Sequence, residues 1–253
     1  MQKILITALL LTLGACSTTN QEHLTMATLW TQNAGEVRAL SYQAFNIAKM
    51  KLDKDLRRSS KKTRALVVDV DETVVDNSPF QAQGILDNSS YPTGWREWID
   101  MANAAALPGA VEFLNYAHKR GVEVFYITNR KVVGFDATYK NLVDLGFPVK
   151  KENMMLRLKD SSKKSRRAKV LKNHRIVLLM GDNLGDFSEV FEVDNTKERN
   201  DLVDQNKKYF GDRFIVLPNA MYGNWEGAVY DGNMRLPAAE KKKIRHQRLK
   251  AIR

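Results

Sequence analysis

Five short apolar runs alternate with helical patterns over most of this chain. The runs cover residues 65–70, 122–128, 154–156, 175–180 and 213–217. Because most are apolar throughout rather than at every second position, we expect strands that are buried on both faces. Helical spacing fills the intervals at residues 94–105, 108–120, 135–145 and 163–172. The pattern predicts an α/β fold with a mostly parallel sheet and helices on both of its faces.

Three further segments flank or interrupt this alternation. Residues 24–54 carry apolar side chains three and four positions apart, which predicts one or two amphipathic helices with a break near Gly35. Residues 77–105 are longer than a simple crossover and rich in aromatic side chains, so they are either a helical insertion that covers the site or a surface packing element. The C-terminal "EKKKIRHQRLKAIR" predicts a basic helix, either solvated or directed at an anionic membrane surface.

The N-terminus has the features of an export signal. An apolar run at residues 4–13 follows Lys3 and is too short to span a bilayer. "LGAC" at residues 13–16 resembles a bacterial lipobox, which implies removal of residues 1–15 and lipidation of Cys16. Ser17 then favours sorting to the outer membrane, with the lipid as anchor. An ordinary signal peptide with a chance cysteine is the alternative.

These patterns divide the chain into three parts. Residues 1–15 are the expected signal peptide, residues 16–63 a lipidated tether with N-terminal helices, and residues 64–253 the core. The core includes the insertion at about residues 77–105 and the basic C-terminal helix.

Composition narrows the chemistry. Forty Lys and Arg against 29 Asp and Glu give a net charge of +11, which favours anionic partners such as phosphorylated molecules, nucleic acid or an acidic membrane. Cys16 is the only cysteine, so an intrachain disulfide and a cysteine nucleophile within the core are excluded. The sequence also lacks a P-loop, an Arg-His-Gly stretch and a zinc-type ligand cluster.

Polar residues of particular kinds follow the apolar runs. Asp69 and Asp71 end the first run, Thr128 and Asn129 the second, and "GDNLGD" at residues 181–186 the fourth. Because the carboxyl ends of parallel strands meet at one edge of a sheet, we expect these side chains to converge there. Each motif alone could be a solvated turn or a helix cap, but their common position favours one site.

Crowded carboxylates suit a hard cation. Mg²⁺ prefers oxygen ligands and commonly binds through one or two carboxylates and a substrate phosphate. With a metal present, one aspartate of the Asp-x-Asp pair can attack phosphorus, and the other can act as general acid and base. Thr128 and a lysine of the basic stretch "KDSSKKSRR" can bind the phosphoryl oxygens.

Three segments carry a resemblance to a known family. "VVDVDETVVDNSPF" (residues 67–80), "VFYITNR" (124–130) and "VLLMGDNLGDF" (177–187) resemble the four-aspartate phosphatases of the haloacid dehalogenase (HAD) superfamily, specifically the bacterial class C non-specific acid phosphatases. The likeness extends over nearly the whole mature chain. It implies a Rossmann-like HAD fold with a smaller helical cap and N-terminal helical region.

The resemblance implies roles for the strand-end residues. Asp69 becomes the nucleophile and Asp71 the general acid and base. One Mg²⁺ per chain is held by Asp69, the backbone carbonyl of Asp71, and Asp182. Glu72 and Asp76, the other two acids of the first motif, are expected to cap or brace the turn.

Further roles follow from the same resemblance. Thr128 binds the phosphoryl group, and Asp186 orients the lysine or the metal shell. Lys164 neutralises the aspartyl phosphate, with Lys159 and Lys163 as competitors within the basic stretch.

The family's substrates point to nucleoside and nicotinamide 5'-monophosphates, held by aromatic side chains. The candidate substrate-binding residues are Asn129, Phe80, Trp95, Tyr222 and Trp225. The sequence therefore predicts a Mg²⁺-dependent acid phosphomonoesterase and 5'-nucleotidase of the outer membrane, with no stable nucleic-acid partner and a possible homodimer. A lipoprotein that binds haem or nucleic acid without catalysis, a phosphotransferase, and a phosphatase for sugars or phosphoproteins are the alternatives.

Overall fold

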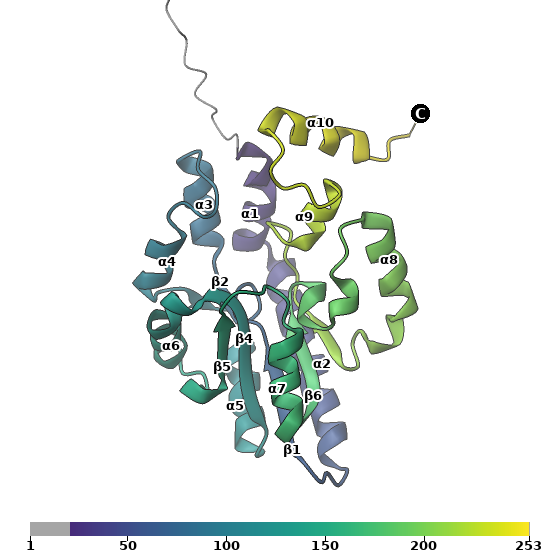
Figure 1. Ribbon diagram of the computed structural model, residues 1–253. Coiled ribbons are helices and arrows are strands. Elements are labelled where there is room, and N and C mark those ends of the chain that lie inside the picture. The colour runs from purple at the N-terminus through teal and green to yellow at the C-terminus, as the bar shows by residue number, and fades with distance from the viewer. Residues whose placement is uncertain (1–20, 253) are drawn as a thin grey trace, which may run out of the picture.

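A parallel sheet organises the computed structural model, which describes residues 21–252 (Figure 1). Within these residues the sheet has five strands in the order β5-β4-β1-β6-β7. The strands are β1 (Thr63–Val68), β4 (Glu123–Lys131), β5 (Met154–Arg157), β6 (His174–Gly181) and β7 (Phe214–Val216). All four neighbouring pairs are parallel. Each predicted strand is therefore confirmed, and so is the α/β fold class.

Helices account for most of the remaining chain. They are α1 (Thr25–Asn33), α2 (Gly35–Leu56), α3 (Ser78–Leu86), α4 (Trp95–Met101), α5 (Ala110–Lys119), α6 (Phe135–Asp144), α7 (Lys164–Asn173), α8 (Thr196–Gln205), α9 (Asn224–Val229) and α10 (Ala238–Arg248). Short 3-10 turns include η1 (Glu22–Leu24) and η4 (Leu184–Asp186). The predicted break near Gly35 is confirmed, because Ala34 adopts an extended ψ of 126° between α1 and α2.

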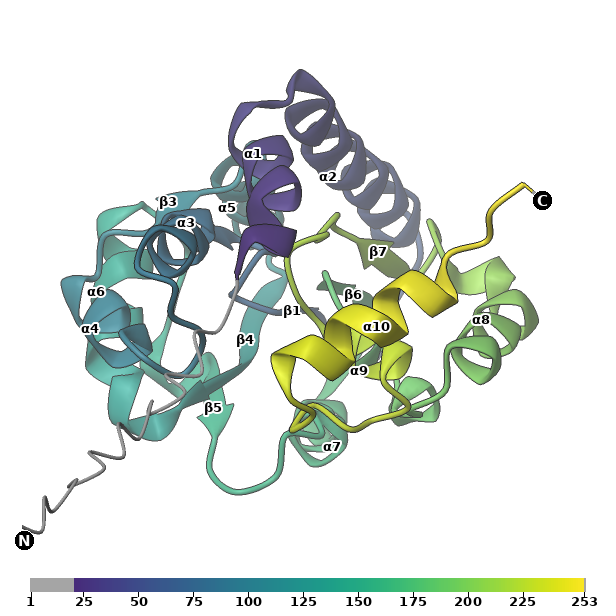
Figure 2. The same ribbon diagram turned by 90° about the horizontal axis from the view of Figure 1, so that it is seen from above.

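Both faces of the sheet are buried, which explains the uninterrupted apolar runs. In β1, Leu66 and Val68 pack in a core cluster with α2 and α5, whereas Ala65 and Val67 join Val170 of α7 in a second cluster. Seen from above, α2 and α7 lie on opposite sides of the sheet (Figure 2). Alternate side chains of one strand thus fill two different cores.

The aromatic-rich segment after β1 is closed at its base by a small antiparallel ladder. The strands β2 (Val75–Asp76) and β3 (Ala105–Ala106) pair with each other, and α3 and α4 lie between them. The short pairing fixes both ends of the segment close to the end of β1.

Two helices were not expected from the sequence, namely α8 and α9, whereas α3 lies within the helical insertion predicted at about residues 77–105. The sequence "TKERNDLVDQ" of α8 has few apolar residues, and its clearest signal is the N-cap Asn195, whose side chain accepts hydrogen bonds from the backbone of Lys197 and Glu198. Apolar periodicity is too weak to reveal a helix of this kind.

The predicted signal peptide and Cys16 lie outside the described residues. Among residues 21–252, none of the helices combines the length and the apolar character that crossing a bilayer requires.

Candidate active site

A cleft of about 910 Å³ lies beyond the carboxyl ends of the strands, as the sequence predicts. Its floor includes Asp69, Asp182 and Lys163, and its walls come from α3, α4, the segment before α9, and α10. Asp69 directly follows β1, and its backbone N–H donates to the carbonyl of Met180 at 3.0 Å. This bond continues the pairing of β1 with β6 beyond the strand and fixes the position of Asp69.

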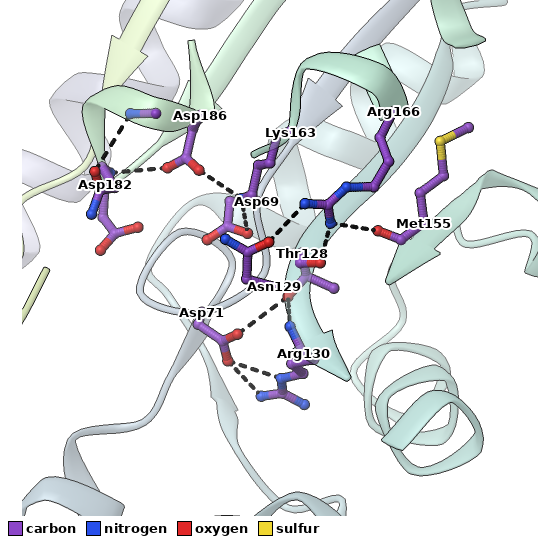
Figure 3. Close-up of polar contacts among 12 residues, drawn as sticks. Asp69, Asp71, Thr128, Asn129, Arg130, Met155, Lys163, Arg166, Asp182 and Asp186 are labelled. Atoms are coloured by element: carbon purple, nitrogen blue, oxygen red, sulfur yellow. Dashed lines mark hydrogen bonds and ion pairs between the residues drawn. The ribbon is translucent and has the colours of Figure 1, made fainter. Parts of the chain in front are cut away.

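A buried ion-pair triad occupies the floor (Figure 3). The Lys163 ammonium contacts Asp69 Oδ1 at 2.5 Å and Asp186 Oδ1 at 2.6 Å. All three side chains are less than a tenth exposed. Lys163 reaches this position because it is the N-cap of α7, which packs beneath β1 and β6.

Three carboxylates gather around this lysine. Asp69, Asp182 and Asp186 each offer an oxygen, and these oxygens lie within 4.8 Å of one another. One ammonium does not balance three carboxylates, so the cluster suits a hard divalent cation with oxygen ligands. The donor set therefore fits the expected Mg²⁺.

The pKa values report the same excess of negative charge. Burial raises the pKa of Asp69 to about 7; Lys163 opposes this shift, and the carboxylates of Asp186 and Asp71 add to it. The pKa of Asp182 is also raised, first by burial and then by Asp186 and Asp69. Burial alone would lower the pKa of Lys163, but its two aspartate partners outweigh burial and raise it. Binding of a metal ion by these carboxylates would therefore release protons.

Asp186 is held by its own turn. Its Oδ2 accepts a hydrogen bond from the Asn183 backbone at 2.9 Å, and the Asn183 side chain caps the same 3-10 turn. A Cβ at Gly181 would lie 2.2 Å from Asp186 Oδ2. The glycine of the "GDN" motif is required by this close approach.

Asp71 has different partners from Asp69. Its Oδ1 accepts from Arg130 Nε and from Asn77 Nδ2, each at 2.9 Å, and its Oδ2 accepts from Thr128 Oγ1 at 3.3 Å. The side chain of Asp71 is not part of the three-carboxylate cluster. A metal contact through its backbone carbonyl stays a prediction.

The other two acids of the first motif brace the turn, as expected. The backbone N–H of Asn77 donates to Glu72 Oε1 at 2.7 Å, and that of Ser78 donates to Asp76 Oδ1 at 2.8 Å. Glu72 adopts a φ of 52°, a left-handed conformation that its buried hydrogen bonds help to hold.

The structure corrects the preference for Lys164. Lys164 pairs with Glu189 at 3.0 Å and its side chain is 67% exposed, whereas Lys163 lies between the two site aspartates. A helix begins at Lys164, and its geometry directs adjacent side chains to different sides. Spacing within a run of basic residues could not show which lysine would face the floor.

Two arginines of the site were not among the predicted site residues. Arg166 donates to the Thr128 carbonyl at 2.6 Å and to Asn129 Oδ1 at 2.7 Å, and it thereby anchors the end of β4. Arg130 holds Asp71. Both are buried charged residues. Arg166 lies within the basic stretch "KDSSKKSRR", where sequence alone does not show which cation is buried.

Aromatic side chains line the upper cleft. The rings of Phe80 and Trp95 pack edge to face with their centroids 4.9 Å apart, and the ring centroid of Tyr91 lies 6.1 Å from that of Trp95. Tyr222 lies on the wall before α9. Trp225 is not among the described residues that line the cleft, and its indole N–H donates to the Tyr222 carbonyl at 3.2 Å. Contact of Trp225 with substrate therefore stays a prediction, whereas Tyr91 is an addition to the cleft lining.

Comparisons with known proteins agree with this geometry. A family model described as "HAD superfamily, subfamily IIIB (Acid phosphatase)" matches residues 12–225. Two structures of the class C acid phosphatase from Bacillus anthracis, one with tungstate bound, are 46% identical with TM-scores of 0.90. They cover 92% and 93% of this chain, and 99% and 100% of their own chains, respectively.

A class B acid phosphatase from Xenorhabdus bovienii is a more distant relative. It is 27% identical over 139 residues, which are 51% of this chain. The match spans 59% of that relative's length.

We predict that Mg²⁺ stabilises the protein more at high pH than at low pH. The raised pKa values of Asp69 and Asp182 favour the folded state below the ordinary carboxyl value of 3.8. This contribution is lost as the pH rises through the raised pKa of each group, which for Asp69 is about 7. Metal binding relieves the repulsion that remains. At one hundred times its Kd, Mg²⁺ should add about 2.7 kcal/mol to the free energy of unfolding.

Thermal unfolding with Mg²⁺ or with EDTA, below about pH 5.5 and above about pH 8, measures this dependence. Asp182→Asn should reduce the rise in Tm, and Asp201→Asn, which alters an exposed helix pair, should not. An equal rise at both pH values would contradict the prediction.

Proposed function

The chain belongs to the HAD superfamily, subfamily IIIB (acid phosphatase), and from this premise we propose that it hydrolyses phosphomonoesters through a phosphoryl intermediate on Asp69. The observation that carries the proposal is the Asp69–Lys163–Asp186 triad at the floor of an aromatic-walled cleft. The tungstate bound in the Bacillus anthracis relative gives further support, since tungstate is a tetrahedral oxyanion like phosphate.

In the proposed first step, an oxygen of Asp69 attacks phosphorus and the bond from phosphorus to the leaving oxygen breaks. Asp71 gives its proton to the departing alkoxide, which leaves as an alcohol. In the second step, Asp71 takes a proton from water, the water oxygen attacks phosphorus, and the Asp69 carboxylate is restored as phosphate leaves. One water is consumed, and the protons balance.

Other side chains stabilise the negative charge on the phosphoryl oxygens during both steps. The Lys163 ammonium and the Thr128 hydroxyl lie beside Asp69 and Asp71 respectively and can stabilise the equatorial phosphoryl oxygens. Mg²⁺ would be held by Asp69, Asp182 and the Asp71 carbonyl, and it would withdraw charge from the phosphoryl group.

As the substrate we propose a nucleoside 5'-monophosphate or nicotinamide mononucleotide, from which the nucleoside or nicotinamide riboside leaves as the alcohol. An aromatic base can stack on Phe80, Trp95 or Tyr222, which all line the cleft above the triad. Sugar phosphates lack a flat ring and would lose this contribution.

Asp69→Asn should abolish turnover because the amide is a poor nucleophile, with a loss of at least about 10³-fold in kcat. Phosphate release from 5'-AMP, nicotinamide mononucleotide, glucose 6-phosphate, a phosphopeptide and p-nitrophenyl phosphate tests both the reaction and the preference. We expect the two nucleotides to have the highest kcat/KM and EDTA to abolish release.

Activity retained in Asp69→Asn would exclude this nucleophile. A wild-type protein that releases no phosphate from any ester would favour the lipoprotein that binds an acidic ligand. Transfer of phosphate to an added alcohol in place of water would favour the phosphotransferase.

The two adjacent lysines provide a matched test of the site. Lys163→Met should lower kcat/KM for p-nitrophenyl phosphate by about 10²- to 10³-fold, because it removes a buried cation from the phosphoryl group. Lys164→Met breaks only an exposed pair with Glu189 and should stay within about twofold. Circular dichroism establishes that both variants are folded, and equal losses would contradict the assignment of Lys163.

We also propose that Cys16 is lipidated and that the mature protein is anchored in the outer membrane, which "LGAC" and Ser17 support. Cells grown with radiolabelled palmitate should label the wild-type protein and not Cys16→Ala. Label retained by Cys16→Ala would exclude this anchor site.

A further inference from the structure

Two neighbouring aspartates of the site are held by two separate cations. Asp69 contacts Lys163, whereas Asp71 contacts Arg130, whose side chain is only 2% exposed. The Asp71 Oδ1 atom accepts two hydrogen bonds at 2.9 Å, from Arg130 and from Asn77. Within residues 21–252, its Oδ2 atom has a single and longer contact, at 3.3 Å with the Thr128 hydroxyl. Oδ2 is therefore the oxygen available to carry a proton towards a leaving group.

Arg130 has little freedom to move away from Asp71. It also donates to Thr138 Oγ1 of α6 and to Asn77 Oδ1, both at 3.2 Å. The Trp95 ring lies 5.8 Å from the guanidinium carbon. Three elements, β4, α6 and α4, thus determine where this guanidinium lies.

The orientation of the Asn77 amide is fixed by Trp98. An indole N–H can only donate, and Trp98 Nε1 lies 2.8 Å from Asn77 Oδ1. The amide oxygen must therefore face Trp98 and Arg130, which leaves the amide N–H groups for Asp71 and for Glu72 Oε2 at 3.3 Å. Asn77, which is fully buried, therefore links Trp98 to Asp71 through its two hydrogen bonds.

From these contacts we propose that Arg130, Asn77 and Trp98 are positioning residues that hold the Asp71 carboxyl group for proton transfer to the leaving group. The inference deepens the proposed function, on which it rests. Trp98 belongs to α4, the same helix that carries Trp95 of the aromatic wall. The segment that covers the cleft is therefore also the segment that orients the acid.

The test exploits the dependence of general-acid catalysis on the leaving group. An alkoxide needs a proton as it departs, whereas 2,4-dinitrophenolate does not. Arg130→Met should lower kcat/KM for an alkyl phosphate by about 10²-fold and for 2,4-dinitrophenyl phosphate by less than about fivefold. Trp98→Phe keeps an aromatic ring but loses the donor, and it should show the same asymmetry at about tenfold for the alkyl ester.

Two matched variants separate positioning from general destabilisation. Arg199→Met removes another buried arginine, one that donates to the Phe191 carbonyl, and Trp30→Phe removes another partly buried indole. Both should leave the ratio of the two kcat/KM values at the wild-type value even where the Tm falls. If Arg130→Met does not fold, Trp98→Phe and Asn77→Ala are measured in its place.

Equal losses on both esters in the folded variants would overturn the inference, because they would indicate that Arg130 acts on the phosphoryl group or only on stability. Because kcat/KM reports the steps up to departure of the leaving group, slow hydrolysis of the intermediate does not obscure the comparison. A wild-type protein inactive on both esters would instead refute the proposed function.

Discussion

Burial of like charge is the constraint on which the site depends. Asp69, Asp182 and Asp186 lie within one cluster, and Asp71 lies only two residues from Asp69. Taking carboxylates out of water is costly unless each is paired or hydrogen-bonded. Lys163 and Arg130 meet this requirement on two sides of the site, and Asn219 donates to Asp182 at 2.8 Å. The remaining negative charge suits the site to a divalent cation with oxygen ligands.

Much of the surrounding structure follows from placing these charges. The start of α7 must place Lys163 at the floor, and Arg166 of the same helix holds the end of β4 through hydrogen bonds to the Thr128 carbonyl and the Asn129 side chain. Gly181 must lack a side chain so that Asp186 can approach. The motif residues therefore depend on residues such as Arg166 and Gly181, and a substitution at either of these would shift the site carboxylates.

The aromatic-rich segment has two proposed roles, which neighbouring residues of the same segment carry. Phe80 and Trp95 shape the wall of the cleft, while Trp98 and Asn77 connect that wall to Asp71. The β2–β3 ladder holds both ends of the segment beside the floor. Substrate selection and proton transfer are thereby linked through a few hydrogen bonds in the proposed mechanism.

The sequence by itself determined the sheet, most of the larger helices and the aspartates at the strand ends. Continuous apolar runs, helical spacing and the polar residues that follow each run can all be read from neighbouring positions in the chain. The sequence could not choose between Lys163 and Lys164, since that choice depends on the rotation of α7 against the sheet. It gave no sign that Arg130 and Asn77 share Asp71, or that Trp225 lies off the cleft wall. Tertiary structure decided these points because the partners come from segments distant in sequence, and only packing brings them into contact.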